Sequence, residues 1–357
     1  MYDNFSGDFE AFSNSWWPYF IAMFIGIISA IRFYVGGAQC PKSHRMDGKI
    51  VIITGGASGL GFETAKNLAA RGAHVVLAVR NEERGKRAQK ELKKLYTNAS
   101  IDVKLLDISS VASIRSFAHD IQTSYPKVDV LINNAAVIYQ PFIKTPEGNE
   151  LTLATNYLGP FLLTHLLLPL LNKSLNGRII NVSAMAHYSG KLRLDDLNME
   201  KDYNEKDAFS QSKLALTIFT KYLATLLDNT RIHCNSVSPG LVRGTNHLEN
   251  LPLQRSLWTK VSVWPWMWLF LKNPIQGCQS IVYLAVEPNL SNISGYYFSD
   301  CEIKEPADPV KDATLAQALY DRTSDMVNIA GRRIIEELKA KESQHAVNES
   351  GDNEDNF

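Results

Sequence analysis

Cysteine is scarce in this 357-residue sequence, with only Cys40, Cys234, Cys278 and Cys301, and no two of them form a C-x-x-C pair. No run of histidines at metal-ligand spacing accompanies them, so the pattern predicts neither a metal site nor a dense disulfide framework. Scattered cysteines of this kind are typical of a reducing compartment. An excess of either charge is also missing, because 37 basic residues balance 37 acidic ones. The sequence therefore gives no reason to expect a nucleic-acid or acidic partner.

Charge is absent altogether from one long stretch, the 21 residues from Ala11 to Ile31. A helix needs about 20 mostly apolar residues to cross a bilayer. Trp16 and Trp17 lie near one end of the stretch and Phe33-Tyr34 at the other, where such rings suit the two membrane interfaces. We therefore predict a transmembrane anchor over residues 11–34. A cleaved signal peptide and a buried core helix are the alternatives.

The residues on either side of this stretch orient it. Residues 1–10 carry three acids and no base, whereas Arg32, Lys42 and Arg45 lie at its other end. An acidic start is unlike a signal peptide, which begins with a basic region. Because basic residues favour the cytosolic side, we expect residues 1–10 to form a lumenal tail and the main domain to face the cytosol after a single pass.

From residue 47 onward, short apolar runs alternate with amphipathic stretches, which is typical of β-α-β units with a parallel sheet. The predicted fold is α/β, a doubly wound parallel sheet of Rossmann type in a single domain over residues 47–333. The polar end of the chain, residues 336–357, is predicted to be a disordered tail. We expect strands at Lys49–Thr54, His74–Val79, Asp102–Leu106, Val128–Asn133, Arg178–Ser183 and Arg231–Val237, and helices at Gly61–Arg71, Glu82–Tyr96, Val111–Ser124, Asn149–Asn172 and Phe209–Asp228.

A glycine-rich turn joins the first predicted strand to the first predicted helix of this domain. Glycine permits a tight turn and close backbone approach, and the amides at a helix N-terminus hold a pyrophosphate. The turn between a strand and a helix is the context that dinucleotide binding requires. The residues predicted to bind the cofactor here are Thr54, Gly55, Ser58, Gly59, Leu60 and Gly61.

The end of the second predicted strand indicates which dinucleotide binds. An acid at this place would select NAD through the ribose 2′-hydroxyl. The sequence has Val79 and then Arg80 there, and a guanidinium can pair with a 2′-phosphate. We therefore predict NADP(H), the alternative being that Arg80 is an ordinary solvated residue. Asp107, at the end of the third strand, is placed to reach the adenine.

Four of the six tryptophans gather late in the chain. The segment from Leu257 to Leu271 holds Trp258, Trp264, Trp266 and Trp268. One interpretation is an ordinary lid or core helix over the cleft. The other is a surface that meets lipid headgroups or a lipophilic substrate, because indole prefers interfaces.

Several motifs occur together in a fixed order. They are Thr54-Gly55-x-x-x-Gly59-x-Gly61, Asn133-Asn134-Ala135-Ala136, Asn156-Tyr157-Leu158-Gly159, Ser212-Lys213 and Pro239-Gly240. With these motifs the chain resembles the short-chain dehydrogenases/reductases from about residue 49 to residue 298. Within that family it looks like the membrane-bound retinol dehydrogenases, the WW domain-containing oxidoreductase and the polyprenol dehydrogenase branch.

The resemblance implies a catalytic set that this chain matches only in part. In the family, a Tyr-x-x-x-Lys pair supplies the acid/base and a serine shares the substrate oxygen. Lys213 and Asn156 match the family's lysine and asparagine, whereas Phe209 occupies the tyrosine position and Ala184 the serine position. Phenylalanine has no proton to give, and alanine has no hydroxyl.

Other positions implied by the resemblance border this set. Asn133, Pro239 and Gly240 belong to the cofactor contacts, and Lys213 also holds the nicotinamide ribose. The family's threonine after Pro-Gly falls at Gly244, with Thr245 shifted by one place. Ser183 should point off the other face of its strand. The residues that could replace the missing hydroxyl are Ser210, Tyr203 and Tyr188.

Three functions follow as hypotheses. The first is an NADP(H)-dependent oxidoreductase of a lipophilic alcohol or carbonyl, retinoid-, sterol- or polyprenol-like, with impaired chemistry, on the cytosolic face of the endoplasmic reticulum membrane. The second is a cofactor-binding pseudoenzyme that acts through protein partners at that membrane. The third is an epimerase or dehydratase on the same fold, with a sugar substrate.

Overall fold

A mixed sheet of eight strands forms the centre of the computed structural model, which describes residues 15–41, 44–243 and 266–351. Its strand order is β3-β2-β1-β4-β5-β6-β7-β8, parallel throughout except for the antiparallel pair β7 and β8. The order reverses between β1 and β4, as in a doubly wound Rossmann sheet. The predicted fold class is confirmed. The strands are β1 (Ile50–Thr54), β2 (His74–Val79), β3 (Ile101–Leu105), β4 (Val130–Asn133), β5 (Gly177–Val182), β6 (Ile232–Ser238), β7 (Tyr297–Ser299) and β8 (Glu302–Lys304).

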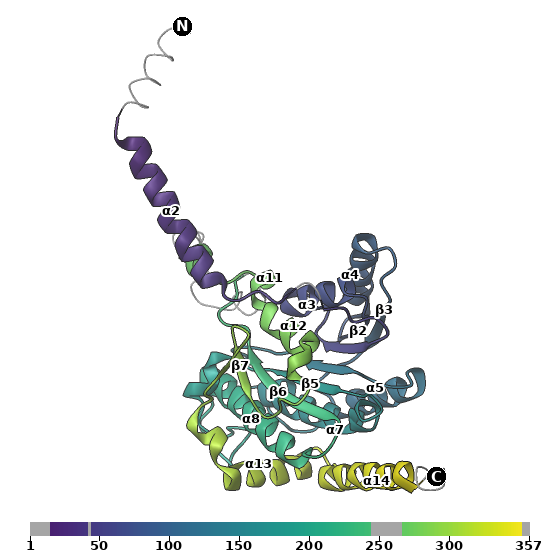
Figure 1. The fold of residues 1–357 in the computed structure, drawn as a ribbon. Helices are drawn as coiled ribbons and strands as arrows, with labels where there is room; N and C mark the ends of the chain where they lie inside the picture. Colours follow the sequence, from purple (N-terminus) through teal and green to yellow (C-terminus); the bar gives the residue numbers. More distant parts are fainter. Residues whose placement is uncertain (1–14, 42–43, 244–265, 352–357) are drawn as a thin grey trace.

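Helices cover both faces of the sheet (Figure 1). Side chains alternate along a strand, so Val51 and Ile53 of β1 pack into one core while Ile52 packs into the other. The first core lies under α3 (Gly59–Ala70), α4 (Glu82–Leu95), α11 (Pro274–Gly277) and α12 (Gln279–Val286). The larger core lies under α5 (Val111–Ser124), α7 (Gly159–Leu171), α8 (Glu205–Leu226), α13 (Ala313–Met326) and α14 (Gly331–Gly351).

The six predicted strands and the helices around them are present, with ends shifted by a few residues. Helix α8 begins at Glu205 rather than at Phe209, because the Asn204 side chain caps it by accepting from the amides of Lys206 and Asp207. The helix predicted over residues 149–172 is divided into α6 (Leu151–Leu153), a π-helical turn η1 (Ala154–Leu158) and α7. Short 3₁₀ turns connect other elements: η2 (Met185–Ser189), η4 (Pro288–Leu290) and η5 (Asp308–Lys311).

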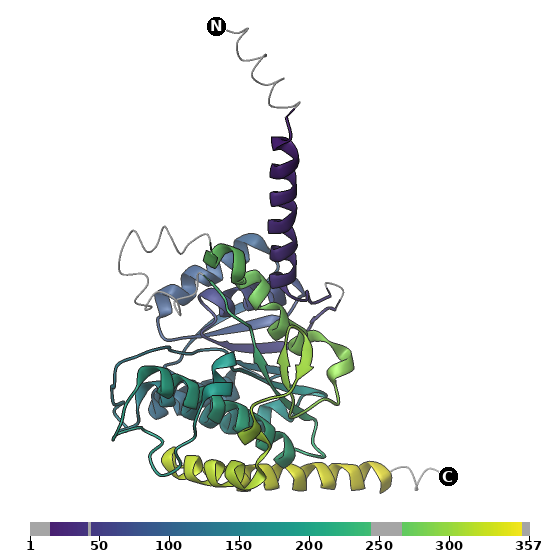
Figure 2. The ribbon, with the colours of Figure 1, turned by 90° about the vertical axis from the view of Figure 1, so that its left-hand side faces the viewer.

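An apolar helix, α2 (Trp17–Gly36), extends away from the domain (Figures 1 and 2). It is long and apolar enough to cross a membrane, and only 6% of its most apolar window is buried. The alternative of a buried core helix is therefore wrong for this segment. The segment Leu151–Leu171 passes the same test of length and composition, but it is 89% buried and belongs to the core.

The C-terminal segment differs from the prediction. Residues 336–357 were expected to form a disordered tail, yet α14 continues to Gly351, so the prediction is wrong for residues 336–351. The physical reason is a short apolar face on the first turns of this helix, where Ile335 and Leu338 are buried in the larger core. The domain thus extends beyond residue 333, the end that the sequence suggested. Figure 2 shows α14 running along the edge of the domain that is farthest from α2.

The burial of Leu338 makes this boundary testable. Replacing Leu338 with alanine leaves a cavity in the core, and we expect the free energy of unfolding to fall by about 2 kcal/mol or more. The matched control is Glu337→Ala, because the Glu337 side chain is half exposed and its ion pair with Arg333 lies on the surface. Urea denaturation measures both variants. Equal midpoints for the two would show that α14 does not contribute to the core.

Candidate functional site: a dinucleotide cleft with an altered catalytic end

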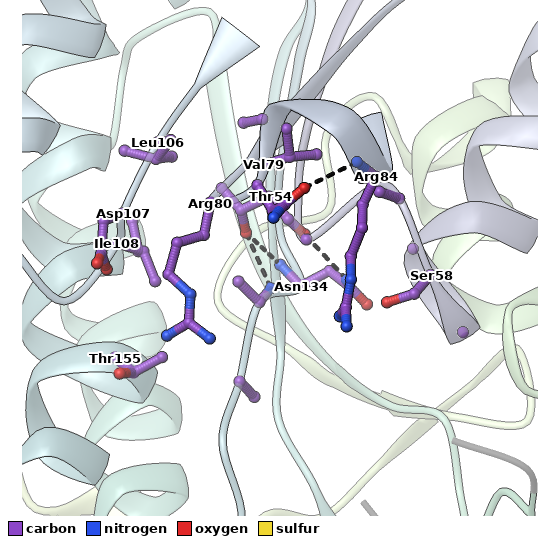
Figure 3. Close-up of a pocket in the computed structure, with 18 of the residues that line it drawn as sticks. Thr54, Ser58, Val79, Arg80, Arg84, Leu106, Asp107, Ile108, Asn134 and Thr155 are labelled. Carbon is purple, nitrogen blue, oxygen red and sulfur yellow. Dashed lines mark hydrogen bonds between the residues drawn. The ribbon is translucent and has the colours of Figure 1, made fainter. Parts of the chain in front are cut away.

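A pocket opens at the carboxyl ends of β1, β2, β3 and β4, where the strand order reverses. This is the place where doubly wound sheets bind ligands. Figure 3 shows the side chains around it. The residues that line it are Thr54, Gly55, Ala57, Ser58, Gly59, Leu60, Gly61, Ala78, Val79, Arg80, Asn81, Arg84, Leu106, Asp107, Ile108, Asn134, Ala135, Ala136, Val137 and Thr155.

The glycine turn has the backbone of a phosphate cradle. Gly55 and Gly59 have φ of 67° and 53°, in the left-handed region that favours glycine. At Gly61 a Cβ would collide with the carbonyl oxygen of Gly55. Helix α3 begins at Gly59, so the amides of its first turn face the pocket, and Ser58 makes no side-chain capping bond to them. These amides and the exposed Ser58 hydroxyl fit a pyrophosphate.

Thr54 belongs to the turn but has a structural part in it. Its hydroxyl is buried and accepts from the backbone amides of Asn134 and Ala135 at 2.9 Å each. The same hydroxyl donates to the Ile132 carbonyl at 3.4 Å. The Asn134 amide group in turn donates to the Thr54 carbonyl at 2.9 Å. These bonds hold the loop after β4 against the glycine turn.

The two asparagines at the end of β4 lie on different sides of the chain. Asn133, which the resemblance placed among the cofactor contacts, is 2% exposed and donates to Thr164 and to Asn181 beneath the sheet. The structure does not bring it into the pocket. Its neighbour Asn134 lines the pocket instead, because successive residues point to opposite sides.

Two arginines reach the adenosine end of the pocket. Arg80 follows β2, and Arg84 lies in the first turn of α4, whose cap Asn81 accepts from the Arg84 amide at 2.9 Å. Figure 3 shows both guanidinium groups extending into the pocket. The sequence analysis identified Arg80 and missed Arg84, although the spacing of four residues across a helix start could have indicated it. Among the described lining residues, Asp107 is the only carboxylate, and its Oδ1 accepts from Ser109.

Asn156 lies in the π-helical turn η1 and is completely buried. Its Oδ1 accepts from the Val137 amide at 2.8 Å, and its Nδ2 donates to the Val137 carbonyl at 2.9 Å and to the Ser212 hydroxyl at 3.0 Å. Both amide hydrogens are therefore used within the protein. Asn156 connects the loop after β4 to helix α8, and a π turn at such a position is common at functional sites.

Lys213 is the buried cation of the site. It is 3% exposed, and its Nζ donates to the Val182 carbonyl at 2.8 Å. Burial lowers the pKa of this amine to about 7. Phe209 precedes it by one helical turn, and its ring centroid lies 6.0 Å from Nζ. Phe209 therefore occupies the place beside the lysine, without a proton to transfer.

The serine position behaves as expected. Ala184 follows β5 with an extended backbone and starts η2. Ser183 points to the other side, where its hydroxyl bonds Thr217 at 2.8 Å and donates to the Lys213 carbonyl at 3.3 Å.

The three residues that the sequence suggested as sources of the missing catalytic hydroxyl all have hydrogen-bond partners elsewhere. The Tyr203 hydroxyl lies 2.7 Å from the Gln140 carbonyl, and the Tyr188 hydroxyl donates to the Glu305 carbonyl at 2.5 Å. Ser210 accepts from Ser189.

The sequence analysis missed a tyrosine that lies against Phe209. The rings of Tyr139 and Phe209 meet edge to face at 5.9 Å between centroids. Tyr139 belongs to the loop after β4 and has φ of 51°, which is uncommon for a bulky residue and occurs most often at functional sites. No motif marks this position, so only the folded chain brings the Tyr139 ring against Phe209.

Pro239 and Gly240 follow β6 and lie outside the pocket lining. Gly240 has φ of 76°, and its amide donates to the Ser238 hydroxyl at 3.2 Å. Gly244 and Thr245 lie outside the described residues. Within the described ranges, no group of three or more His, Cys, Asp or Glu side chains could hold a metal ion.

Comparison with known proteins identifies the family. The model of the short chain dehydrogenase family matches residues 49–256. The chain therefore belongs to the short-chain dehydrogenases/reductases, which use a nicotinamide cofactor.

Among individual relatives, retinol dehydrogenase 13 of Mus musculus is 38% identical over 307 residues, which cover 86% of this chain and 92% of that protein. Retinol dehydrogenase 14 of Mus musculus is 39% identical over 297 residues, covering 80% and 87%. The solved structure of an uncharacterized protein from Mycobacterium paratuberculosis matches with a TM-score of 0.66 at 29% identity, covering 82% of this chain and 98% of that chain.

The two pocket arginines predict a preference between the two cofactors. If they pair with a 2′-phosphate, Arg80→Ala and Arg84→Ala should each weaken NADPH binding about tenfold or more, since a hydrogen bond to a charged group contributes about 1.5–3 kcal/mol. NADH binding should change little. Arg87→Ala is the matched control, because its side chain is 75% exposed and its near charge is Glu83. Fluorescence titration measures the affinity of wild type and of the three variants for both cofactors, and equal loss for NADH and NADPH would refute the assignment.

The pKa of Lys213 predicts a pH dependence of cofactor binding. Below a pKa of about 7 the buried side chain is an ammonium, which binds the acceptor oxygens of a ribose better than the neutral amine does. The affinity for NADPH should therefore fall as the pH rises from about 7 to about 9, by about threefold or more. In Lys213→Met the same change should be absent. A parallel decline in both proteins, measured by calorimetry, would assign the effect to another group.

Proposed function

We propose that this chain is a membrane-anchored NADP(H)-binding oxidoreductase of a lipophilic alcohol or carbonyl, with weakened acid–base chemistry. The observation that carries the proposal is a pocket built on the glycine turn, connected through Val137, Asn156 and Ser212 to the helix of the buried Lys213, where the tyrosine and serine positions are Phe209 and Ala184. The substrate is retinoid-, sterol- or polyprenol-like. The names of the relatives, retinol dehydrogenases 13 and 14, support this class.

The adenosine end of the cleft supports NADP(H) over NAD(H). Arg80 and Arg84 both line the pocket at the end of β2, where an NAD-binding chain would place an acid. A 2′-phosphate carries the charge that two guanidinium groups complement. Asp107 is held by Ser109, since its Oδ1 accepts both from the amide and from the hydroxyl of that residue.

The chain has residues for some of the catalytic tasks and lacks residues for others. The nicotinamide, when bound, supplies or takes up the hydride. Lys213 places a positive charge beside the cleft and Asn156 fixes the loop that borders it. Reduction of a carbonyl also needs a proton on the oxygen, and Phe209 and Ala184 offer neither a proton nor a hydrogen bond. General acid–base catalysis contributes about 10²- to 10⁴-fold, so its loss predicts slow turnover.

The proposed location follows from α2. Its exposed apolar surface and 20-residue length suit a single membrane crossing. We place the main domain on the cytosolic face of the endoplasmic reticulum, where a lipophilic alcohol dissolved in the bilayer is available to it.

The alternative is a cofactor-binding pseudoenzyme that acts through protein partners. The specific observation in its favour is that both catalytic hydroxyls are absent while the bonds that build the site remain, from Thr54 to Asn156 and Ser212. Such a chain would bind NADPH tightly and change its conformation on binding, without catalysing a reaction.

A restored catalytic pair separates the two functions. Wild-type protein with NADPH and a panel of retinal, a sterol ketone and a polyprenal should show slow turnover, and Phe209→Tyr with Ala184→Ser should raise it by about 10²-fold or more. Lys213→Met in the restored background is the control that should abolish the gain. Tight NADPH binding without turnover in either protein would contradict the oxidoreductase and favour the pseudoenzyme.

Tyr139 needs its own comparison in the same assay. If its hydroxyl supplies the proton in the wild type, Tyr139→Phe should remove the residual turnover and leave the restored double variant active. If the proton comes from water, Tyr139→Phe should leave both rates unchanged. NADPH affinity, measured beside the rates, shows whether the cleft has kept its shape.

A further inference from the structure

A short helical turn at residues 266–270, the aromatic segment, exposes three large rings. Trp266, Trp268 and Phe270 are 62%, 37% and 48% exposed. The rings of Trp266 and Phe270, one helical turn apart, stack at 6.0 Å with planes 4° from parallel. Rings of this size exposed together mark a contact surface rather than a random feature of a soluble face.

Arg32, the only charged residue within α2, fixes this segment to the apolar helix. Its guanidinium donates to the carbonyls of Trp268 at 2.7 Å and Leu271 at 3.0 Å, and to the Gln276 side chain at 3.3 Å. The same group lies 5.2 Å above the Trp268 ring. The last carbonyls of a helical turn need donors, and a cation near that end is favourable.

These contacts of Arg32, the Arg32 clamp, fix the position of the aromatic segment along the axis of α2. Arg32 lies four residues before Gly36, which is about 6 Å from the domain end of the helix at 1.5 Å per residue. Phe33 and Tyr34, 88% and 87% exposed, lie on the same turn. Figures 1 and 2 show the start of the described green segment beside this end of α2. Aromatic rings and a basic residue at one end of an apolar helix are typical of a membrane interface.

A second cation lies at the same ring. Arg243 is 5.7 Å from the Trp268 ring centroid, so two guanidinium groups border one indole. Partial burial, and then the nearby charge of Arg32, lower the pKa of Arg243. Two like charges held together are stabilised by an anion, and lipid phosphates are the anions that accompany an apolar surface.

The aromatic segment is also joined to the loop that follows β6. Lys272 forms a parallel bridge with the chain at Val242, donating to the Leu241 carbonyl at 2.9 Å and accepting from the Arg243 amide at 2.8 Å. The Lys272 side chain pairs with Asp300 and lies against Gly240 at the end of β6. The segment therefore adjoins the loop that follows the Pro-Gly motif.

We propose that the aromatic segment is a second membrane contact, seated by Arg32 in the interface of the bilayer that α2 spans, and that it turns the substrate end of the cleft toward the lipid. This inference depends on the membrane anchor of the proposed function. Trp266 and Phe270 lie among the parts of the acyl chains next to the headgroups, and Arg32 and Arg243 face the lipid phosphates. A lipophilic substrate then passes from the bilayer to the site without crossing water.

Depth-dependent quenching tests the inference on the full-length protein. The chain is reconstituted into vesicles of phosphatidylcholine and phosphatidylserine, with a bimane label on a cysteine introduced as Trp266→Cys. The control is Leu175→Cys, which is 82% exposed between α7 and β5 at the opposite end of the strands. Unsubstituted protein gives the background from the native thiols, of which three are buried.

Lipids with a shallow spin label should quench the bimane at position 266 at least twofold more than lipids with a deep one, and neither should quench it at position 175. No quenching at position 266 in protein that resists carbonate extraction would overturn the inference and leave the anchor intact. Extraction by carbonate would overturn the anchor, and the inference with it.

The clamp has a test of its own in the same vesicles. Arg32→Met removes the donors to the Trp268 and Leu271 carbonyls, so quenching at position 266 should fall at least twofold. Arg333→Met is the matched control, because the Arg333 side chain is 79% exposed on α14, far from the anchor. Unchanged quenching in Arg32→Met would show that Arg32 does not seat the segment.

Discussion

The site depends on one hydroxyl, that of Thr54, which holds the loop after β4 against the glycine turn. It accepts the amides of Asn134 and Ala135, and the turn can approach this loop because Gly61 has no Cβ. The loop continues to Val137, whose amide and carbonyl both bond Asn156. Asn156 donates to Ser212, and the Ser212 hydroxyl donates to the Phe209 carbonyl at 2.7 Å. One series of hydrogen bonds thus connects the phosphate cradle to the altered catalytic position.

None of these bonds uses the side chain of the residue at position 209. The series runs through backbone groups, the Asn156 side-chain amide and the hydroxyls of Thr54 and Ser212, so a phenyl ring completes the packing as well as a phenol would. Phe209 is 6% exposed and contacts Tyr139. A phenylalanine at the position where the family has tyrosine therefore leaves the scaffold in place. The bonds that shape the cofactor pocket do not depend on a hydroxyl at position 209.

Sequence patterns predicted those parts that depend on local backbone preference. Short apolar runs located β1 and β2, amphipathic stretches located their helices, and the glycine spacing located the cradle, because all three are properties of neighbouring residues. The sequence pattern could not tell which of Asn133 and Asn134 faces the pocket, since this depends on how the end of β4 is oriented. Arg84 and Tyr139 reach the site through the packing of α4 and of the loop after β4. The helix α14 was missed because its apolar face is short: among its residues of described burial, Ile335 and Leu338 are the buried apolar side chains beyond its first turn's Ile334, which is partly buried. Strands β7 and β8 have three residues each, too few for a period.

The bonds made by Arg32 restrict how the domain can turn relative to α2, which is joined to it through glycine. The chain leaves α2 through Gly36 and Gly37, and Gly37 adopts φ of 68°, so the joint has little intrinsic stiffness. A domain tethered only there would sample many orientations, and its cleft would face the membrane for a fraction of the time. Bonds from Arg32 to the carbonyls of Trp268 and Leu271 add a second fixed point, and two points remove most of this rotation. Under the proposed function, in which the chain lacks two catalytic hydroxyls, a high local concentration of a membrane-dissolved substrate would offset a low rate constant for as long as the site is not saturated.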